Sequence, residues 1–165
     1  MTDEHFSAWL AGFFEGDGSV NYRYKFDNKN RYANVQFSQK DKRVLEYIES
    51  VFGGRFYQHK TSSVWYLTYD GRRGSPVLNV LAPCIVGSVM FEALSAVRSI
   101  LGLPEILTHK PSLDWFVGFW DAEGSSSYED YALHLDVSQN DKSLLERIRD
   151  ELPFGGSIYP NGSCY

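Results

Sequence analysis

The sequence predicts an α+β fold of two pseudo-symmetric αββαβ(β)αα units with antiparallel sheets, and three observations support this prediction. Three blocks of sequence occur twice in the same order. Helix-like and strand-like patterns alternate within each copy. The 165 residues are 43% hydrophobic and 16% aromatic, which argues against disorder. A chain of this length can enclose one substantial core or form two small units that share an interface.

The repeat is carried by three ordered pairs of segments. These pairs are WLAGFFEGDGS (9–19) with WFVGFWDAEGS (115–125), VQFSQKDKRVLEYI (35–48) with LDVSQNDKSLLERI (135–148), and FGGRFY (52–57) with FGGSIY (154–159). The offsets of 106, 100 and 102 residues differ only by small insertions or deletions. The pattern indicates an internal duplication and two similar subdomains related by a pseudo-two-fold axis.

The first copy predicts a helix, two strands, a helix, two more strands and two closing helices. We expect helices at about 5–16 and 41–51, strands at 19–26, 32–38, 55–60 and 63–69, and closing helices at 76–84 and 86–101. The strands show polar and apolar alternation, and the turn at 27–30 is polar. Apolar residues in 41–51 recur at helical spacing. The four strands should form one antiparallel sheet.

The second copy predicts the same order of elements, from a helix at 112–122 to a strand around 157–159. Ser112 is the expected N-cap, and each opening helix is expected to stop at a glycine, Gly18 or Gly124. The predicted organisation is a first repeat at 1–101, a linker at 102–111 and a second repeat at 112–165. The second repeat is expected to be incomplete at its C-terminus and to expose apolar residues such as Val137 and Ile158.

The two opening helices carry the residues suited to chemistry. Small residues lie four apart, Gly12 with Gly16 and Gly118 with Ala122, so they share one helix face and allow two backbones to approach closely. Asp17 and Glu123 then meet at the helix C-termini, where their negative charges and the helix dipoles conflict. A divalent cation such as Mg²⁺ relieves this conflict. The alternative is a polar helix end with a glycine cap and no chemistry.

The segments LAGFFEGDG (10–18) and FVGFWDAEG (116–124) resemble the motif of the LAGLIDADG homing endonucleases. The resemblance implies paired motif helices at the interface of two sheets that form a saddle over double-stranded DNA. It also implies a monomeric, site-specific DNA endonuclease that uses Mg²⁺ or Mn²⁺ and belongs to an intron- or intein-type mobile element. The residues carried over are metal ligands at Asp17, Glu123 and the carbonyls of Gly16 and Ala122, and polar residues near the attacking water at Gln39 and Gln139. The family's basic residue before the last helix falls around Gly87 or Ser88, where this chain has neither Lys nor Arg.

Strand alternation predicts which side chains face DNA. If Val20 and Tyr22 face the core, the neighbouring polar residues face outward, where Arg, Asn and Gln can pair with base edges. The candidate DNA-binding residues are Asn21, Arg23, Lys25, Arg31, Asn34, Gln36, Ser38, Arg55, Tyr57 and His59. The alternative is an ordinary solvated sheet face.

The net charge bears on whether the chain binds nucleic acid. The chain carries a net charge of −5 and has a pI of about 5.3, which argues against nucleic-acid binding. Residues 1–110 hold 13 Lys and Arg against 11 Asp and Glu, whereas residues 111–165 hold 3 against 10. The first repeat is therefore expected to carry most of the DNA affinity.

The composition excludes some classes and leaves others open. The chain has no apolar run of membrane-spanning length and begins with a polar segment, so we expect an intracellular protein without a membrane partner, in the cytoplasm or an organelle. Two alternatives to an endonuclease remain. One is a non-cleaving nucleic-acid binder, such as a maturase-like relative, and the other is a protein-interaction module.

Overall fold

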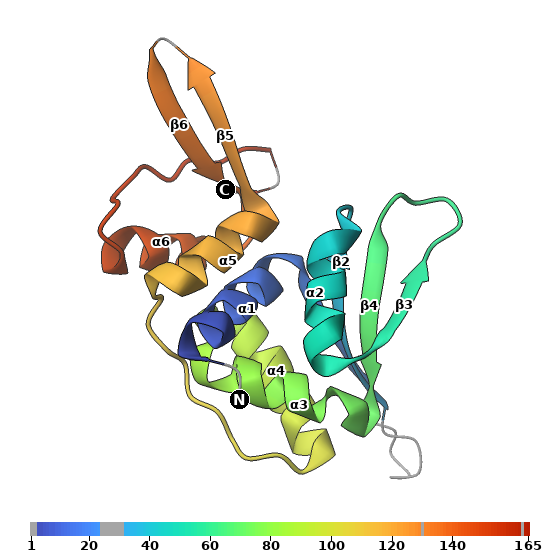
Figure 1. The fold of residues 1–165 in the computed structure, drawn as a ribbon. Coiled ribbons are helices and arrows are strands. Elements are labelled where there is room, and N and C mark those ends of the chain that lie inside the picture. Colours follow the sequence, from blue (N-terminus) through green and yellow to red (C-terminus); the bar gives the residue numbers. More distant parts are fainter. Residues whose placement is uncertain (1–2, 24–31, 130, 163) are drawn as a thin grey trace.

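The computed structural model of the 165-residue chain describes residues 3–23, 32–129, 131–162 and 164–165. The mixed α+β fold predicted from the sequence is confirmed (Figure 1). The first repeat contains α1 (Glu4–Asp17), β1 (Gly18–Arg23), β2 (Tyr32–Gln39), α2 (Lys42–Phe52), β3 (Arg55–Gln58), β4 (Trp65–Asp70), α3 (Ser75–Leu81) and α4 (Ser88–Leu101), with short 3-10 turns η1 (Gly71–Gly74) and η2 (Ala82–Cys84). The second repeat contains α5 (Leu113–Glu123), β5 (Gly124–Glu129), β6 (Ala132–Val137) and α6 (Lys142–Glu151).

The first repeat forms the predicted four-stranded antiparallel sheet, in the order β1-β2-β4-β3. Its inner face is apolar because alternate residues of paired strands point the same way. Val35 pairs with Tyr69 and Phe37 pairs with Leu67, and all four are buried. Helix α2 packs on β2 and β4, and α4 packs on β1 and β2. The polar alternate residues are left on the opposite face.

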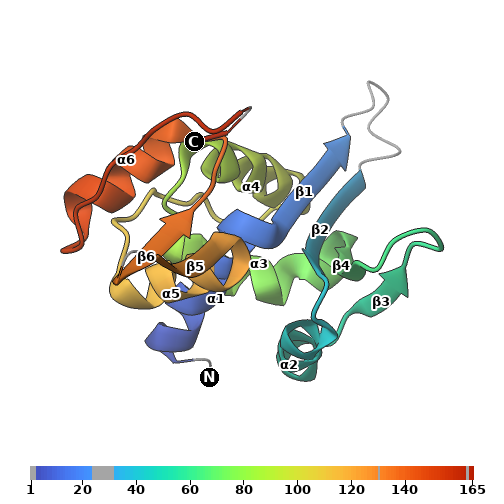
Figure 2. The ribbon, with the colours of Figure 1, turned by 90° about the horizontal axis from the view of Figure 1, so that it is seen from above.

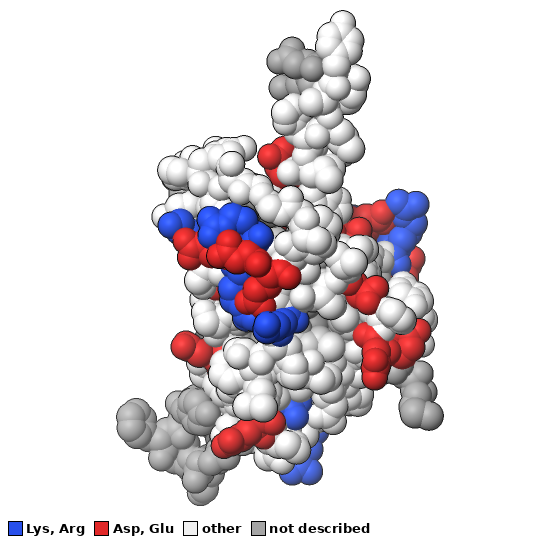
Figure 3. Space-filling view, turned by 90° about the vertical axis from the view of Figure 1, so that its left-hand side faces the viewer, with Lys and Arg blue, Asp and Glu red and all other residues white. Residues whose placement is uncertain are grey.

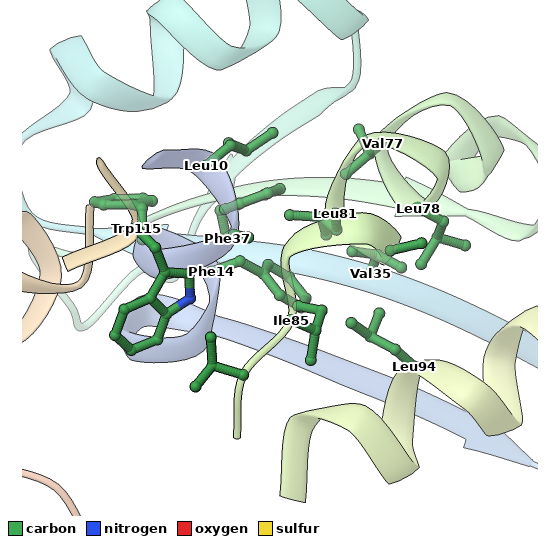
Figure 4. Close-up of a cluster of buried hydrophobic side chains, with 14 of the residues drawn as sticks. Leu10, Phe14, Val35, Phe37, Val77, Leu78, Leu81, Ile85, Leu94 and Trp115 are labelled. Carbon is green, nitrogen blue, oxygen red and sulfur yellow. The ribbon is translucent and has the colours of Figure 1, made fainter. Parts of the chain in front are cut away.

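The core continues from this sheet into the helices of both repeats. Figure 4 shows Leu10 and Phe14 of α1 and Phe37 of β2 among side chains of α3 and α4, with Trp115 of α5 in the same cluster. Trp115 is only 1% exposed. Since burying a large apolar side chain contributes about 1.5–3 kcal/mol, this contact alone ties α5 firmly to the first repeat.

Helix α5 begins at the expected cap, since Ser112 accepts a hydrogen bond from the Trp115 N–H. Helix α1 is capped by Asp3, which accepts a hydrogen bond from the Phe6 N–H and for which no cap was predicted. The helices end at Asp17 and Glu123, and the glycine that follows each is extended rather than left-handed. Glycine is therefore required after each helix for a reason other than a left-handed backbone. A Cβ on Gly18 would lie 2.3 Å from Phe14 and one on Gly124 would lie 2.4 Å from Trp120, so a close contact requires glycine there.

The closing helices are shorter than expected. Helix α3 ends at Leu81 and continues only as a 3-10 turn, and α4 begins at Ser88. The prediction that a helix starts at residue 86 is wrong, because the N–H groups of Val86 and Gly87 are used by another part of the molecule, the side chain of Glu15.

The second repeat forms a two-stranded hairpin, β5–β6, that projects from the body of the molecule (Figure 1). The strand expected at 157–159 is absent from the described chain. The first repeat explains this, because β3 pairs only with β4 and not with β2. Without a counterpart of β4, residues 157–159 have no strand to pair with.

One pairing of the first sheet recurs at the edge of this hairpin. The backbone of Gln139 exchanges two hydrogen bonds with Tyr165, as Gln39 pairs with Trp65 in the first repeat. The exposed apolar residues differ from those expected. Val137 and Ile158 are partly buried, whereas Leu133 and Leu135 are 65% and 63% exposed. Among the described residues, no helix has the length and apolar character required to cross a bilayer.

Candidate metal centre and nucleic-acid face

Helices α1 and α5 pack against each other at the centre of the molecule, between the two sheets (Figures 1 and 2). Their glycines allow the backbones to touch. A Cβ on Gly12 would lie 1.8 Å from the Trp115 carbonyl oxygen, and a Cβ on Gly118 would lie 1.8 Å from that of Trp9. At the C-terminal ends, a Cβ on Gly16 would lie 2.9 Å from Cγ of Glu123. The two helices therefore run in the same direction and bring their last residues together.

Asp17 and Glu123 are placed at this junction. Burial, and after it the nearby Glu123 carboxylate, raise the pKa of Asp17 to about 7, while a hydrogen bond from Gln39 opposes the shift. Burial also raises the pKa of Glu123. Two partly buried carboxylates that each resist ionisation are the arrangement that a bound cation stabilises.

Gln39 lies beside this pair of acids. Its Nε2 donates to Oδ2 of Asp17 at 2.6 Å, and the Ser38 hydroxyl donates to the Asp17 carbonyl at 3.1 Å. Gln139 occupies the equivalent place in the second repeat, and in both residues the side-chain oxygen accepts the next backbone N–H at 2.7 Å. Among the described side chains, however, no hydrogen bond joins Gln139 to Glu123. The structure thus brings Gln39 to Asp17 and leaves Gln139 turned to its own backbone.

The donor set at the junction is compatible with a magnesium-type ion. Mg²⁺ is held in proteins by one or two carboxylates, with water and substrate phosphate completing six positions. Asp17 and Glu123 supply two carboxylates, and the carbonyls of Gly16 and Ala122 belong to the same last helical turns. No group of three or more His, Cys, Asp or Glu suited to a metal occurs in the described part of the chain. A cation here would depend on the two acids, backbone oxygens and its substrate.

The outer face of the first sheet carries most of the described candidate DNA contacts. Asn21, Arg55, Tyr57 and His59 are exposed, and Gln36 and Ser38 are partly exposed. Tyr57 stacks on Tyr66, with ring centroids 4.7 Å apart, and its hydroxyl donates to Oε1 of Gln36 at 3.3 Å. This polar and aromatic surface is the one predicted from alternation.

The four other candidates are Asn34, Arg23, Lys25 and Arg31. Asn34 lies on the same face but is only 6% exposed, and its amide donates to Asp70 at 2.9 Å. Arg23 is the last residue of β1. Lys25 and Arg31 lie outside the described residues.

The second repeat presents a different electrostatic surface. Residues 124–137 contain no Lys or Arg, and Figure 3 shows the projecting hairpin without basic atoms on the visible side. The three basic residues of 111–165 all lie on α6, and each forms an ion pair with an acid of the same helix: Lys142 with Glu146, Arg147 with Glu151, and Arg149 with Asp150. This part of the molecule offers little unpaired positive charge to a phosphate backbone.

Two cross-helix hydrogen bonds were not predicted from the sequence. Trp9 Nε1 donates to Asp121 at 2.8 Å, and Trp115 Nε1 donates to Glu15 at 3.2 Å. The residues are equivalent in the two copies, at the same offset of 106. The repeat alignment therefore contained a usable signal, because each copy has a Trp followed six residues later by an acid. In the structure, the Trp of each copy donates to the acid of the other copy.

Comparisons with known proteins agree with this arrangement. Residues 10–83 match the LAGLIDADG endonuclease family. The chain is 27% identical over 164 residues to the intron-encoded RNA maturase bI4 of Saccharomyces cerevisiae, covering 93% of this chain and 25% of that protein. It is 25% identical over 181 residues to the probable intron-encoded endonuclease aI2 of Debaryomyces hansenii, covering 95% and 26%. The chain thus spans about a quarter of the length of these relatives.

Solved structures share the fold. The LAGLIDADG meganuclease I-AabMI, bound to uncleaved DNA, superposes with a TM-score of 0.66 at 14% identity, covering 96% of this chain and 76% of that one. I-SmaMI, bound to its uncleaved DNA target in the presence of calcium ions, gives a TM-score of 0.62 at 16% identity, covering 94% and 75%. The fold of this chain is therefore that of the LAGLIDADG meganucleases. Its sequence is similar to the LAGLIDADG endonuclease family over residues 10–83.

The shifted pKa of Asp17 predicts a pH dependence for the metal-free protein. Protonated Asp17 is favoured in the folded state, so its stabilising contribution is complete below its ordinary pKa of 3.8 and is lost as pH rises through about 7. The wild-type protein should therefore lose stability between about pH 4 and pH 7, and replacing Asp17 by Asn should reduce this loss by roughly 1 kcal/mol, a value lowered to allow for solvent screening. Urea unfolding in EDTA at each pH measures this. Parallel curves for the two proteins would contradict it.

Proposed function

We propose that this chain is a site-specific, divalent-metal-dependent endonuclease of double-stranded DNA. The observation that carries the proposal is the meeting of Asp17 and Glu123 at the aligned ends of α1 and α5, next to a polar sheet face. The intron-encoded relatives support a role in a mobile intron or intein inside the cell or an organelle. In this monomer, residues 1–101 and 112–165 would be the two repeats and residues 102–111 the linker between them.

We assign one set of residues to cation binding and another set to DNA binding. Asp17 and Glu123, with the carbonyls of Gly16 and Ala122, would hold Mg²⁺ or Mn²⁺. Such an ion activates water and stabilises the oxygen that leaves the phosphodiester. Gln39 orients the Asp17 carboxylate through its 2.6 Å hydrogen bond. Gln139 lies at the equivalent place and is proposed to reorient toward water when DNA is bound.

The outer face of the first sheet is proposed to lie in the major groove. Its Asn, Gln and Arg side chains offer the paired hydrogen-bonding groups that distinguish base edges there. The tyrosine pair of Tyr57 and Tyr66 gives this face a rigid, apolar patch among polar groups. The proposed contacts are Asn21, Arg23, Lys25, Arg31, Asn34, Gln36, Ser38, Arg55, Tyr57 and His59.

Selection from a random duplex library tests the proposal directly. The protein is incubated with the library and Mg²⁺, and newly formed ends are captured and sequenced. We expect one long recognition sequence to be enriched, and no cleavage in EDTA. Absence of cleavage with Mg²⁺ and Mn²⁺, at protein concentrations that saturate DNA binding, would reject endonuclease activity for this chain.

A second candidate function is RNA binding of the maturase type. One observation favours it, the 27% identity to an RNA maturase. Tight binding to structured intron RNA, without cleavage of any duplex in the library, would support this candidate over the first.

Arg55 provides a test of the proposed DNA face. It is exposed on β3, so Arg55→Ala should remove one phosphate or base contact without disturbing the core. We expect a loss of affinity of about 5- to 10-fold at moderate salt, and a salt slope smaller by about one if the contact is to phosphate. Fluorescence anisotropy at several salt concentrations measures both.

Arg43 is a matched control for Arg55. It is also an exposed arginine of the first repeat, but it lies on α2, which packs on the opposite face of the sheet, and it is paired with Asp41. Arg43→Ala should leave both affinity and salt slope unchanged. Equal losses of DNA affinity in the two variants would show that the DNA surface does not include β3.

A further inference from the structure

Glu15 is a buried acid for which the proposed chemistry has no role. Its side chain lies on the last turn of α1, two residues before Asp17, and the residue is 6% exposed. Burying an ionisable group is costly unless it is hydrogen-bonded. Three N–H groups approach it: those of Val86 and Gly87 at 2.6 Å each, and the indole of Trp115 at 3.2 Å. These donors come from two separate parts of the chain.

The segment 85–87 that holds Glu15 is itself tied to the second repeat. The guanidinium of Arg147 on α6 donates to the Val86 carbonyl at 2.6 Å and to the His109 carbonyl at 2.8 Å. The His109 N–H donates to the Ile85 carbonyl at 2.8 Å. A continuous set of hydrogen bonds therefore runs from α6, through this segment, to the last turn of α1.

Gly87 is fitted to the Glu15 carboxylate. A Cβ at this position would lie 2.6 Å from Oε2 of Glu15. Any side chain here would have to displace the carboxylate. This explains why the place expected to hold a basic residue holds glycine instead: the space is taken by an acid of α1.

The second repeat has a weaker counterpart of the same arrangement. Asp121 occupies the position in α5 that Glu15 occupies in α1, and it accepts from the indole of Trp9 at 2.8 Å. Asp121, however, is exposed to solvent. Of these two equivalent acids, Glu15 is held by buried hydrogen bonds and Asp121 is not.

We propose that Glu15 is a positioning residue that fixes the last turn of α1 against α5 and the 85–87 segment, and thereby sets where the Asp17 carboxylate lies relative to Glu123. This inference rests on the proposed function for its effect on cleavage, but not for its effect on geometry. Glu15 touches neither the cation nor DNA. Its contribution passes through the backbone of Gly16 and Asp17.

The experiment compares Glu15→Gln and Gly87→Ala with Asp121→Asn in the full chain. Glu15→Gln keeps the shape but replaces one acceptor by a donor that faces the N–H groups of Val86 and Gly87. Gly87→Ala keeps Glu15 and displaces it. Asp121→Asn makes the same chemical change as Glu15→Gln at the exposed counterpart. Circular dichroism and thermal melts establish that each variant is folded at the assay temperature.

Two readouts are measured on the folded variants. The first is the single-turnover cleavage rate at saturating DNA, together with the DNA dissociation constant. The second is the side-chain amide resonance of Gln39, which reports its hydrogen bond to Asp17 without metal, DNA or cleavage. A role limited to stability would reduce the amount of folded protein but would not change the rate or the resonance of the molecules that are folded.

We expect Glu15→Gln and Gly87→Ala to lower the cleavage rate at least about 10-fold with the DNA dissociation constant within 2-fold, and to shift the Gln39 amide resonance. Asp121→Asn should leave both readouts near those of the unmodified protein. An unshifted Gln39 resonance in both folded variants would overturn the inference, as would a loss confined to DNA affinity. If the unmodified chain cleaves no DNA, the proposed function fails, and the Gln39 resonance alone decides the role of Glu15.

Discussion

Replacing Asp17 by Asn, or Glu123 by Gln, is expected to lower the rate of DNA cleavage by at least about 1,000-fold. Each change keeps the size of the side chain and removes its negative charge, so a cation at the helix junction loses one of its two carboxylates. A metal ion stabilises the developing charge of the transition state by several kcal/mol, and each 1.36 kcal/mol corresponds to a factor of ten in rate. Single-turnover cleavage of the selected target in Mg²⁺ measures the effect.

DNA binding should survive the same substitutions. The two acids lie at the helix junction and not on the outer sheet face, and removing negative charge near phosphate does not oppose binding. We expect the dissociation constant to stay within about 3-fold or to improve. Asp114→Asn is the control, because Asp114 is a partly exposed acid, ion-paired with His5, at the opposite end of α5. If both Asp17→Asn and Glu123→Gln cleave at the unmodified rate, the metal centre is assigned to the wrong residues.

The duplication made the centre of the fold predictable. Equivalent small residues in two equivalent helices have few ways to pack, and the close approach at Gly12 and Gly118 is the one the sequence pattern favours. The alternation in Tyr32–Gln39 likewise predicted which side of the sheet is buried. Both patterns are local and periodic, so they can be recognised from one sequence.

Contacts between distant segments were not predictable in this way. Residues 157–159 repeat the sequence around β3, yet form no strand, because strand formation there depends on a neighbour and not on local pattern. The expected helix start at residue 86 failed for a related reason. Val86 and Gly87 satisfy the carboxylate of Glu15, 71 and 72 residues away. Similarly, Asn34 has the right alternation for an outward residue, but Asp70 on the adjacent strand holds its amide.

Enlarging the helix contact is expected to cause the largest loss of stability. In Gly12→Ala, the new methyl group would lie 1.8 Å from the Trp115 carbonyl oxygen and 2.8 Å from the Phe119 nitrogen. These are backbone atoms of α5, so the clash can be relieved only by moving a helix that also buries Trp115 and Phe119. Overpacking usually costs about 1–3 kcal/mol and sometimes more, and we expect about 3 kcal/mol or more here. For a domain of this size that lowers Tm by roughly 6–12 °C.

The same substitution should separate the two acids, so it tests whether the helix contact and the candidate metal centre depend on each other. Gly118→Ala makes the equivalent clash with the Trp9 carbonyl oxygen at 1.8 Å and should have an effect of similar size. Gly102→Ala is the control: Gly102 has a φ of +70° and nothing within 4 Å of the added methyl group, so only the left-handed backbone opposes it, at roughly 1–2 kcal/mol. Thermal unfolding and cleavage below the melting temperature are measured for all three variants. We expect the two interface variants to lose cleavage activity even where they are folded, and the control to retain it. A Gly12→Ala protein that melts and cleaves like the control would show that α1 and α5 do not make this contact in solution, and with it the shared position of Asp17 and Glu123 would lose its structural basis.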